Sequence, residues 1–202
     1  MVYRSPLLAV VLLAAGCGAH GGGSGNSAPT APATGSAAGA AAANAALVRS
    51  ERERTALWKL RESIPEAQRH EGASLKHDIS LPVATLPDFV ARATPWVSAH
   101  VPEGRLVPYG HVGDGNLHFN ISQLPGGDRE RFLARAAEIR RAIHDLVREF
   151  GGSFSAEHGV GRTKVGELER YASPVELELM RAVKHAFDPH GIMNPGKVLR
   201  EE

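Results

Sequence analysis

The sequence predicts an α+β domain in which a ferredoxin-like split βαβ antiparallel sheet carries helices on one face, followed by C-terminal helices. Two observations predict it. Segments whose apolar residues alternate every second position are interleaved with segments whose apolar residues recur every third or fourth position. Their order is helix, then β-α-β-β-α-β, then two helices, and the central six have the order of a ferredoxin-like layer.

The first 45 residues do not have the composition of a folded domain. Residues 1–17 hold an apolar run that is too short to span a bilayer and end at Cys17, as in a signal or lipoprotein peptide. Lipid anchoring at Cys17 and an accidental apolar start both remain open. Residues 18–45 are dominated by Gly, Ala, Ser, Pro and Thr, which predicts a disordered linker. We therefore expect one folded domain over residues 46–202.

Charge and cysteine content exclude some classes of protein. The formal net charge of +1 over 202 residues predicts no strong electrostatic field, which disfavours nucleic acid or an anionic membrane as the main partner. Cys17 is the single cysteine, so no internal disulfide can stabilise the fold.

The first half of the domain alternates helices and strands. An apolar stripe predicts a helix over residues 46–64, which Pro65 is expected to interrupt or kink. Helix 85–97 has a threonine cap and an early proline, and residues 105–109 form the next strand. Between the two helices, residues 74–80 alternate as a strand with four polar side chains on one face: Ser74, Lys76, Asp78 and Ser80.

The second half follows the same logic. Residues 116–121 alternate as a strand, and residues 128–150 have the clearest helical spacing of the chain, ended by a Gly-Gly pair. A short strand is expected over residues 153–157. Two further helices, over residues 165–171 and 174–187, complete the chain.

The segment from Gly110 to Ile121 concentrates the most chemistry. Asn116 and His118 share one strand face with a third polar residue, Asn120, while apolar residues occupy the other face. Such a polar row is suited to binding a metal ion or an oxygen-rich ligand. His111 precedes a Val-Gly-Asp-Gly sequence that predicts a two-residue hairpin turn. That hairpin would bring His111 alongside His118.

Two histidines on paired strands can share a divalent ion, and a carboxylate is the usual third ligand. Glu157, in the segment Gly151 to Gly159, is the candidate carboxylate. From spacing alone, the alternative that His111 and His118 are structural histidines stays open. Because Glu157 and His158 are consecutive, both can reach one site only through an irregular backbone between Glu157 and Gly159.

Four separated blocks resemble the C-terminal domain of the FAD-linked 2-hydroxy-acid oxidases and dehydrogenases. That family includes D-lactate dehydrogenase, the glycolate oxidase flavin subunit and D-2-hydroxyglutarate dehydrogenase. The resemblance runs in order from about Arg54 to Leu199. The blocks are Leu57 to Ala67, Gly110 to His118, Ser155 to Gly161 and Met193 to Lys197.

The resemblance implies roles for individual residues. His111, His118 and Glu157 would hold a divalent metal, commonly zinc, that binds the hydroxyl and carboxylate oxygens of a 2-hydroxy acid. His158 matches the general base that takes the hydroxyl proton as hydride leaves for the flavin. The remaining matches are Arg61 and Lys76 for the substrate carboxylate, Asn116 for the substrate, and Asn194 for the flavin cofactor.

The resemblance also implies a cofactor and a location. FAD would need a separate FAD-binding domain, because the chain shows no Gly-rich nucleotide-binding turn. Family members are cytoplasmic, which is the alternative to export with a lipid anchor at Cys17. Pro65 stands where the 2-hydroxyglutarate enzymes tend to carry a hydroxyl, which favours the lactate or glycolate branch.

Two classes of function stay open. In the first, the chain is a truncated or split oxidoreductase that works with a FAD-binding polypeptide, or an inactive gene fragment; a homo-oligomer is also compatible. In the second, it is a free-standing binding module for a metal and a hydroxy acid. The first predicts an exposed apolar docking surface, and the second predicts a sealed surface. A hydrolase is disfavoured because no additional nucleophile accompanies the ion site.

Overall fold

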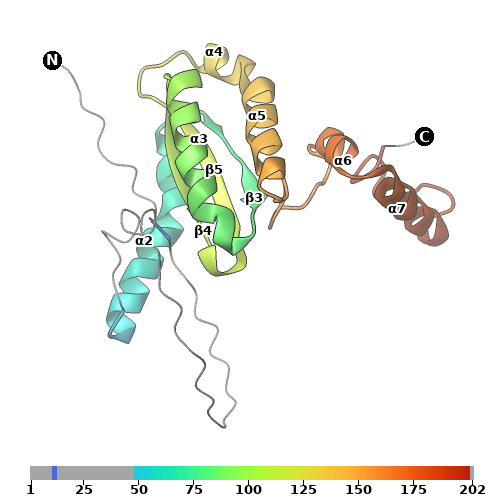
Figure 1. Ribbon diagram of the computed structural model, residues 1–202, viewed down its shortest axis with the longest axis horizontal. Coiled ribbons are helices and arrows are strands. Elements are labelled where there is room, and N and C mark those ends of the chain that lie inside the picture. The colour runs from blue at the N-terminus through green and yellow to red at the C-terminus, as the bar shows by residue number, and fades with distance from the viewer. Residues whose placement is uncertain (1–10, 13–47, 201–202) are drawn as a thin grey trace, which may run out of the picture.

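The structure is a computed structural model that describes residues 11–12 and 48–200 (Figure 1). Apart from β1 (Val11–Leu12), the predicted signal or lipoprotein peptide lies outside the described residues, as does the predicted linker over residues 18–45. β1 pairs in parallel with β4 (Gly104–Gly110) at the end that leads into the Gly110 to Ile121 segment. The domain boundaries therefore stay predictions.

The sheet is built around β5 (Asn116–Gln123). β4 pairs with one edge of β5, and β2 (Ser74–Leu75) and β3 (Asp78–Ser80) pair with the other, all antiparallel. An isolated antiparallel bridge between Ser80 and Ser153 continues the sheet beyond β3. The resulting spatial order is that of a ferredoxin-like layer, so the predicted α+β fold class is confirmed.

Helices cover the apolar face of this sheet. α3 (Leu86–His100) and α5 (Ala136–Glu149) lie side by side over β5 (Figure 1). Phe89, Phe119 and Ile139, from α3, β5 and α5, are completely buried between them. The rings of Phe89 and Phe119 meet edge to face at 5.3 Å, an arrangement that adds to the gain from burying apolar surface.

The polar face is partly covered as well. α2 (Glu51–His70) contacts it near the helix C-terminus, where Gln68 Nε2 donates to Ser122 Oγ at 3.2 Å. Asn120 Nδ2 in turn donates to Gln68 Oε1 at 3.1 Å. Helices are therefore not confined to one face, and α2 closes one end of the polar surface.

The predicted helix 128–150 was wrong as a single helix, and of the two effects predicted for Pro65, an interruption or a kink, the interruption does not occur. α2 continues through Pro65 to His70, because the docking of its last turn by Gln68 offsets the backbone bond that the proline cannot donate. The predicted helix 128–150 is divided at Arg135 into α4 (Arg129–Ala134) and α5. The side chain of Arg135 donates to the backbone carbonyl of His100 at 2.9 Å, a contact that helical spacing does not reveal.

Three expectations about the sheet also need correction. The predicted strand 74–80 is interrupted after β2, because the Asn120 side chain accepts the backbone N–H of His77. The predicted strand 153–157 is reduced to the Ser153 bridge. Beyond it the Ser153 hydroxyl donates to the carbonyl of Ser155 at 2.9 Å and turns the chain into a loop.

The third correction concerns the turn between β4 and β5. Instead of a two-residue hairpin, a short 3-10 helix, η3 (Val112–Asp114), precedes Gly115 in the left-handed conformation at φ 79°. A Cβ atom on Gly115 would lie 2.1 Å from the carbonyl oxygen of Leu81, so only glycine fits. The longer turn still places His111 beside β5, because Asn116 N donates to His111 O at 3.1 Å.

The last two helices leave the sheet. α6 (Val165–Tyr171) and α7 (Pro174–Phe187) were both predicted, and they extend away from the body of the molecule (Figure 1). We call α6, α7 and the segment to Arg200 the arm. A capping box of Ser173 and Glu176 begins α7. Among the described residues, no helix combines the length and apolarity that crossing a membrane requires.

Candidate active site

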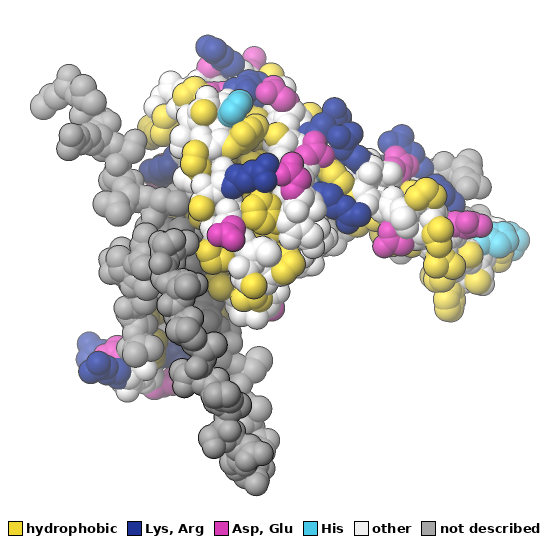
Figure 2. Space-filling view, viewed as in Figure 1, with side chains coloured by type: hydrophobic (Ala, Val, Ile, Leu, Met, Phe, Trp, Pro, Cys, Tyr) yellow, Lys and Arg dark blue, Asp and Glu magenta, His cyan; other side chains and the backbone are white. Residues whose placement is uncertain are grey.

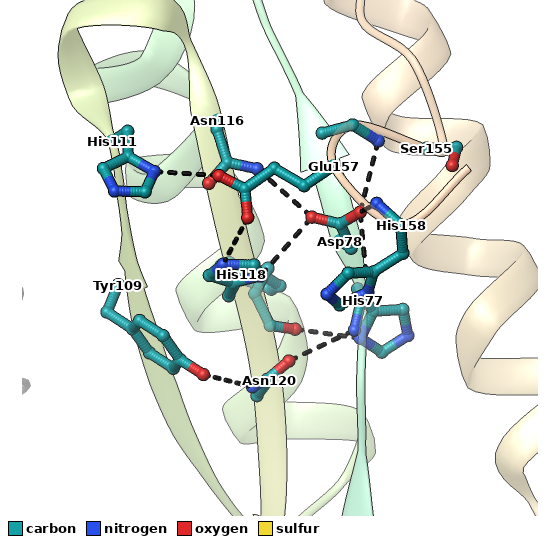
Figure 3. Close-up of polar contacts among 12 residues, drawn as sticks. His77, Asp78, Tyr109, His111, Asn116, His118, Asn120, Ser155, Glu157 and His158 are labelled. Carbon is teal, nitrogen blue, oxygen red and sulfur yellow. Dashed lines mark hydrogen bonds and ion pairs between the residues drawn. The ribbon is translucent and has the colours of Figure 1, made fainter. Parts of the chain in front are cut away.

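Two strands, the start of a turn and a loop converge at one end of the polar face (Figure 3). His111 directly follows β4, His118 lies on β5, and Glu157 lies in the loop after α5. The strand register places Asp78 of β3 on one side of His118 and Tyr109 of β4 on the other. The site is thus assembled from segments that are far apart in the sequence.

The three side chains predicted as metal ligands lie together. His111 Nδ1 is hydrogen-bonded to Glu157 Oε1 at 2.9 Å, and His118 Nε2 lies 3.4 Å from Glu157 Oε2 (Figure 3). The side chain of His118 is 11% exposed and that of Glu157 is 43% exposed, so the group opens to solvent on the Glu157 side. A small solute can therefore reach the group.

Asp78 is a further member of this group that the sequence did not single out. Its carboxylate is 3% exposed and lies 3.4 Å from His118 Nδ1 and 3.6 Å from His158 Nδ1. Four residues offer potential ligand atoms within 4.8 Å of one another: Asp78, His118, Glu157 and His158. The strand alternation placed Asp78 on the polar face, but only the register with β5 shows that it lies opposite His118.

His158 reaches the same side of the sheet as Glu157 because the backbone there is irregular, as expected. Gly159 adopts φ 68°, and the segment is not part of a strand. The His158 ring lies stacked against the His118 ring with centroids 5.7 Å apart, and its side chain is 62% exposed. The side chains of the consecutive residues Glu157 and His158 thus both lie next to His118.

Burial and charge act in opposite directions on these residues. Burial would raise the pKa of the Asp78 carboxyl, but the N–H of His158 and the charges of His158 and His118 outweigh burial and lower the pKa. Burial lowers the pKa of His118, and the carboxylates of Asp78 and Glu157 only partly oppose this. The site therefore favours a charged Asp78 and a neutral His118, whose free ring nitrogen can act as a ligand.

Two of the predicted substrate-binding residues flank the group. The guanidinium carbon of Arg61 lies 4.7 Å from the centre of the Tyr109 ring, which in turn lies against the His118 ring at 4.9 Å. Arg61 is 8% exposed. Asn116 is also buried and donates to Asp78 Oδ1 at 3.2 Å. Within the described ranges, Arg61 Nε and Asn116 Oδ1 are buried without a hydrogen-bond partner, so each retains bonding capacity for a ligand.

Comparison with known proteins identifies the domain. Residues 24–198 match the family described as FAD linked oxidases, C-terminal domain. The chain belongs to this family. The resemblance inferred from the four sequence blocks is therefore confirmed, and with it a FAD-linked oxidoreductase family whose members act on 2-hydroxy acids.

Relatives of this FAD-linked oxidase domain share the same name. D-2-hydroxyglutarate dehydrogenase of Stutzerimonas stutzeri (strain A1501) is 43% identical over 155 residues, which are 77% of this chain and 33% of that protein. The enzyme of that name from Xanthomonas citri pv. viticola is 34% identical over the same shares. The mitochondrial enzyme of Danio rerio is 41% identical over 145 residues, 71% of this chain and 26% of that protein. The chain spans about a third or less of these curated relatives.

Two other predicted residues of the oxidase domain lie apart from the group. Lys76 is exposed in the gap between β2 and β3. Asn194 lies in the arm, where it adopts φ 50° and accepts a hydrogen bond from Lys197 at 3.4 Å. In the part of the chain that the structure describes, no hydrogen bond or ion pair joins either residue to the group. Their roles stay predictions.

The donor set of the group fits a divalent cation. Imidazole nitrogens and a carboxylate are the ligands that zinc and related ions prefer, and catalytic sites of this kind keep a position open for substrate. The partial exposure of His111 and Glu157, at 30% and 43% of their side chains, is compatible with such an open position.

A layer of buried aromatic and basic groups lies behind the site. His77 and His144 meet edge to face at 5.8 Å, and burial lowers the pKa of His77 to about 4 and that of His144 to about 3. His144 also contacts the rings of Phe154 and Tyr171. The apolar stripe of the helix did not reveal His144, because a histidine within such a stripe gives no sign of which way it faces.

Proposed function

We propose that this domain binds a 2-hydroxy acid on a divalent cation held by His111, His118 and Glu157, and presents it for oxidation by FAD to the 2-oxo acid. The observation that carries the proposal is the convergence of these three side chains, with 2.9 Å and 3.4 Å between their ligand atoms, in a member of a FAD-linked oxidase family. The cation, when bound, would act as a Lewis acid on the hydroxyl and carboxylate oxygens.

His158 is the proposed base. Its Nδ1 lies 3.6 Å from the Asp78 carboxylate, so Nε2 is the nitrogen left to accept the substrate hydroxyl proton. The ring is 62% exposed, as a residue that meets an incoming substrate must be. An imidazole suits the task because its ordinary pKa lies close to neutral pH.

Arg61 is the proposed partner of a substrate carboxylate. Its guanidinium is buried against Tyr109 and its Nε has no hydrogen-bond partner among the described residues, so a carboxylate would complete its bonding. Asn116, whose Oδ1 likewise lacks a partner in the described part, would accept from a substrate hydroxyl. Lys76 would contribute a second positive charge.

The relatives favour 2-hydroxyglutarate as the substrate. All three proteins compared above are named D-2-hydroxyglutarate dehydrogenase, which does not support the preference for lactate or glycolate that Pro65 suggested. A dicarboxylate also gives both Arg61 and Lys76 an anionic group to bind. Lactate and glycolate, with one carboxylate each, would leave one of the two cations unused.

The flavin would be carried by a body that docks on the arm. Within the described residues, α7 has no buried residue, and its apolar side chains gather along one side of the arm (Figure 2). A helix of this length is marginal in water without packing, and an extended exposed apolar surface marks an interaction site. The apolar residues exposed on and after α7 are Val175, Leu179, Met180, Val183, Phe187, Ile192, Met193 and Val198.

This surface favours docking of a flavin-binding body over the free-standing binding module, for which a sealed surface was expected. The relatives extend well beyond the matched part, which leaves room in them for a flavin-binding body. Asn194 and Met193 line an apolar hollow on the arm together with Phe187 and Leu179. An amide at the rim of an apolar hollow fits the edge of a flavin ring, and Asn194 would supply that contact.

A zinc titration tests the ion site. The purified chain, with its metal removed, is titrated with Zn²⁺ by calorimetry in the presence and absence of D-2-hydroxyglutarate. We expect one site, and His118→Ala should weaken it at least about tenfold. The matched control is His185→Ala, which removes an exposed histidine from α7. Equal zinc binding by wild type and His118→Ala would contradict the assignment.

A second measurement tests whether the chain retains FAD. Free FAD is added to the chain, and the flavin absorbance that remains with the protein after gel filtration is measured. We expect none to be retained, because the flavin-binding body is required. Retained flavin would contradict this part of the proposal, and lactate or glycolate strengthening zinc binding more than D-2-hydroxyglutarate would contradict the choice of substrate.

A further inference from the structure

Asp78 lies beneath the proposed ion site and is surrounded by nitrogen atoms. Its carboxylate is 3% exposed, yet the described residues offer it no lysine or arginine within ion-pair distance. Instead it faces two imidazoles, one side-chain amide and two backbone N–H groups (Figure 3). The negative charge of this buried carboxylate is therefore stabilised by polar groups of the site itself.

The two oxygens of Asp78 accept three hydrogen bonds and lie near two imidazole nitrogens. Oδ1 accepts from Asn116 Nδ2 at 3.2 Å and lies 3.4 Å from His118 Nδ1. Oδ2 accepts from the backbone N–H of His158 at 2.8 Å and of Ala156 at 3.3 Å, and it lies 3.6 Å from His158 Nδ1. A carboxylate has about four lone-pair positions. Hydrogen bonds take three of these positions and two imidazole nitrogens lie next to the oxygens, so most of the bonding capacity of the carboxylate is used within the protein.

The contacts of Oδ2 fix Glu157. Ala156 and His158 are the residues on either side of Glu157, and the same oxygen accepts both of their backbone N–H groups. The loop pairs with no strand at this point, so these two hydrogen bonds take the place of backbone hydrogen bonds to a neighbouring strand. The position of the Glu157 carboxylate beside His111 and His118 therefore depends on Asp78.

The position of Asp78 Oδ1 bears on which ring nitrogen of His118 carries the proton. Both ring nitrogens of His118 lie 3.4 Å from a carboxylate oxygen, Nδ1 from Asp78 and Nε2 from Glu157. Asp78 is 3% exposed and held by three hydrogen bonds, whereas Glu157 is 43% exposed, so Asp78 is the fixed partner that favours a proton on Nδ1. Nε2, which lies 3.4 Å from Glu157 Oε2, is then left with its lone pair directed into the site. A carboxylate that orients a metal-binding histidine in this way raises its strength as a ligand.

We propose that Asp78 is a positioning residue of this site: it holds the proton of His118 on Nδ1 and clamps the loop that carries Glu157, without binding the ion itself. The inference rests on the proposed ion site. The alternative is direct ligation by Asp78 together with His118, Glu157 and His158, whose ligand atoms lie within 4.8 Å of one another. The two differ in the nitrogen of His118 that carries the proton.

The first test is a ¹⁵N NMR measurement of the His118 ring in wild-type protein without metal, at a pH where the ring is neutral. We expect the proton on Nδ1, and we expect it to stay there when Zn²⁺ is added. A proton on Nε2 in the free protein, or loss of the Nδ1 proton on adding zinc, would overturn the inference. This test needs no variant, so it decides the matter even if substitution prevents folding.

The second test is the affinity for Zn²⁺ of Asp78→Asn. The amide keeps the shape of the side chain but places an N–H group where an acceptor is required, so zinc should bind about 10- to 100-fold more weakly. The His118 ring should lose its preference for the Nδ1 proton in the same variant. Unchanged affinity and an unchanged ring signal would overturn the inference.

Asp188→Asn is the matched control. Asp188 is also a buried carboxylate, 6% exposed, and accepts the backbone N–H groups of Ile192 at 2.9 Å and Met193 at 2.8 Å. It lies in the arm, where it is paired with Lys184, and no histidine ring among the described residues lies against it. Its substitution should leave the zinc affinity unchanged, and an equal loss would mean that general destabilisation, not positioning, explains Asp78→Asn. If wild type binds no zinc, the ion site is refuted, whereas the NMR measurement still tests Asp78.

Discussion

The sheet body and α7 of the arm use apolar residues in opposite ways, although Val165 and Leu168 of α6 are buried. In the body, Phe119 and Ile121 are completely buried between the sheet and two helices. In the arm, Phe187 is 80% exposed, and no described residue of α7 is buried. The body is stabilised by its own packing. The arm holds its shape through local devices, the capping box at Ser173 and the bonds of Asp188, and leaves its apolar face available to another surface.

This difference matches the different roles that we propose for the two regions. Most of the residues that we assign to the ion and the substrate lie on the packed body, where strand register fixes His118 and Asn116. The residues that we assign to docking and to the flavin are mounted on the arm. A site that must hold an ion needs rigid support, whereas a docking surface can gain its final order from the partner.

The largest expected effect separates the two regions by one substitution made twice. Phe119→Ala should lower the free energy of unfolding by about 3–5 kcal/mol, because it leaves a cavity in the closed core. Phe187→Ala should change the free energy of unfolding by less than about 0.5 kcal/mol, because the ring is already exposed in the folded protein. Urea denaturation of both variants measures the contrast, and similar losses would show that the arm is packed in solution.

Two glycines give the next contrast. Gly115, in the body, and Gly191, in the arm, both adopt left-handed φ, at 79° and 65°. Only Gly115 has backbone where a Cβ atom would lie, 2.1 Å from Leu81 O, while nothing lies within 4 Å at Gly191. Gly191→Ala should cost about 1 kcal/mol of strain.

Gly115→Ala should cost more than that in the free energy of unfolding, and it should also weaken zinc binding by moving the turn that carries His111. Thermal and chemical denaturation of the two variants compare the costs. Equal costs would mean that the close approach to Leu81 is easily relieved.

Acid should destabilise the body through its buried histidines. The pKa of His144 is lowered from 6.5 to about 3 in the folded protein, so between these values the unfolded chain binds a proton that the folded chain does not. The contribution of His144 to the free energy of unfolding is therefore fully present above pH 6.5. The free energy of unfolding falls as the pH is lowered towards 3, by up to about 1.4 kcal/mol per pH unit for each such histidine.

His144→Phe should remove one such proton and flatten the dependence in this window. Urea denaturation at pH 7, 6 and 5 measures the slope. His185→Phe, at an exposed position of α7, is the control. An unchanged slope in His144→Phe would show that other groups cause the acid sensitivity.

The smallest effect concerns the start of the arm helix. Ser173 Oγ accepts the backbone N–H of Glu176 at 3.2 Å, and Ser173→Ala should cost α7 about 1 kcal/mol. Hydrogen exchange should speed up in α7 alone, since the body does not depend on it. Ser98→Ala, which removes a hydroxyl in the last turn of α3, should leave exchange in α7 unaltered. Faster exchange in the body as well would show that the two regions unfold together.

Periodicity was sufficient for most of the fold. The alternation along Asn116 to Ile121 and the stripe of the helix after it reflect one-sided burial, which is written directly into the order of residues. The expectations that failed depended on contacts between distant segments: Gln68 carrying α2 past Pro65, Arg135 dividing the helix before α5, and the Ser153 hydroxyl ending the last strand.

By itself, the sequence determined the chemical types of the site, the strand faces that carry them and the family to which the domain belongs. Only the tertiary structure decided which side chains meet. The pairing of β3 with β5 placed Asp78 opposite His118, and the irregular loop brought Glu157 and His158 to the same side. The reason is physical: alternation is a local property of a strand, whereas the neighbour across a sheet is set by register between segments whose separation in the chain carries no signal of it.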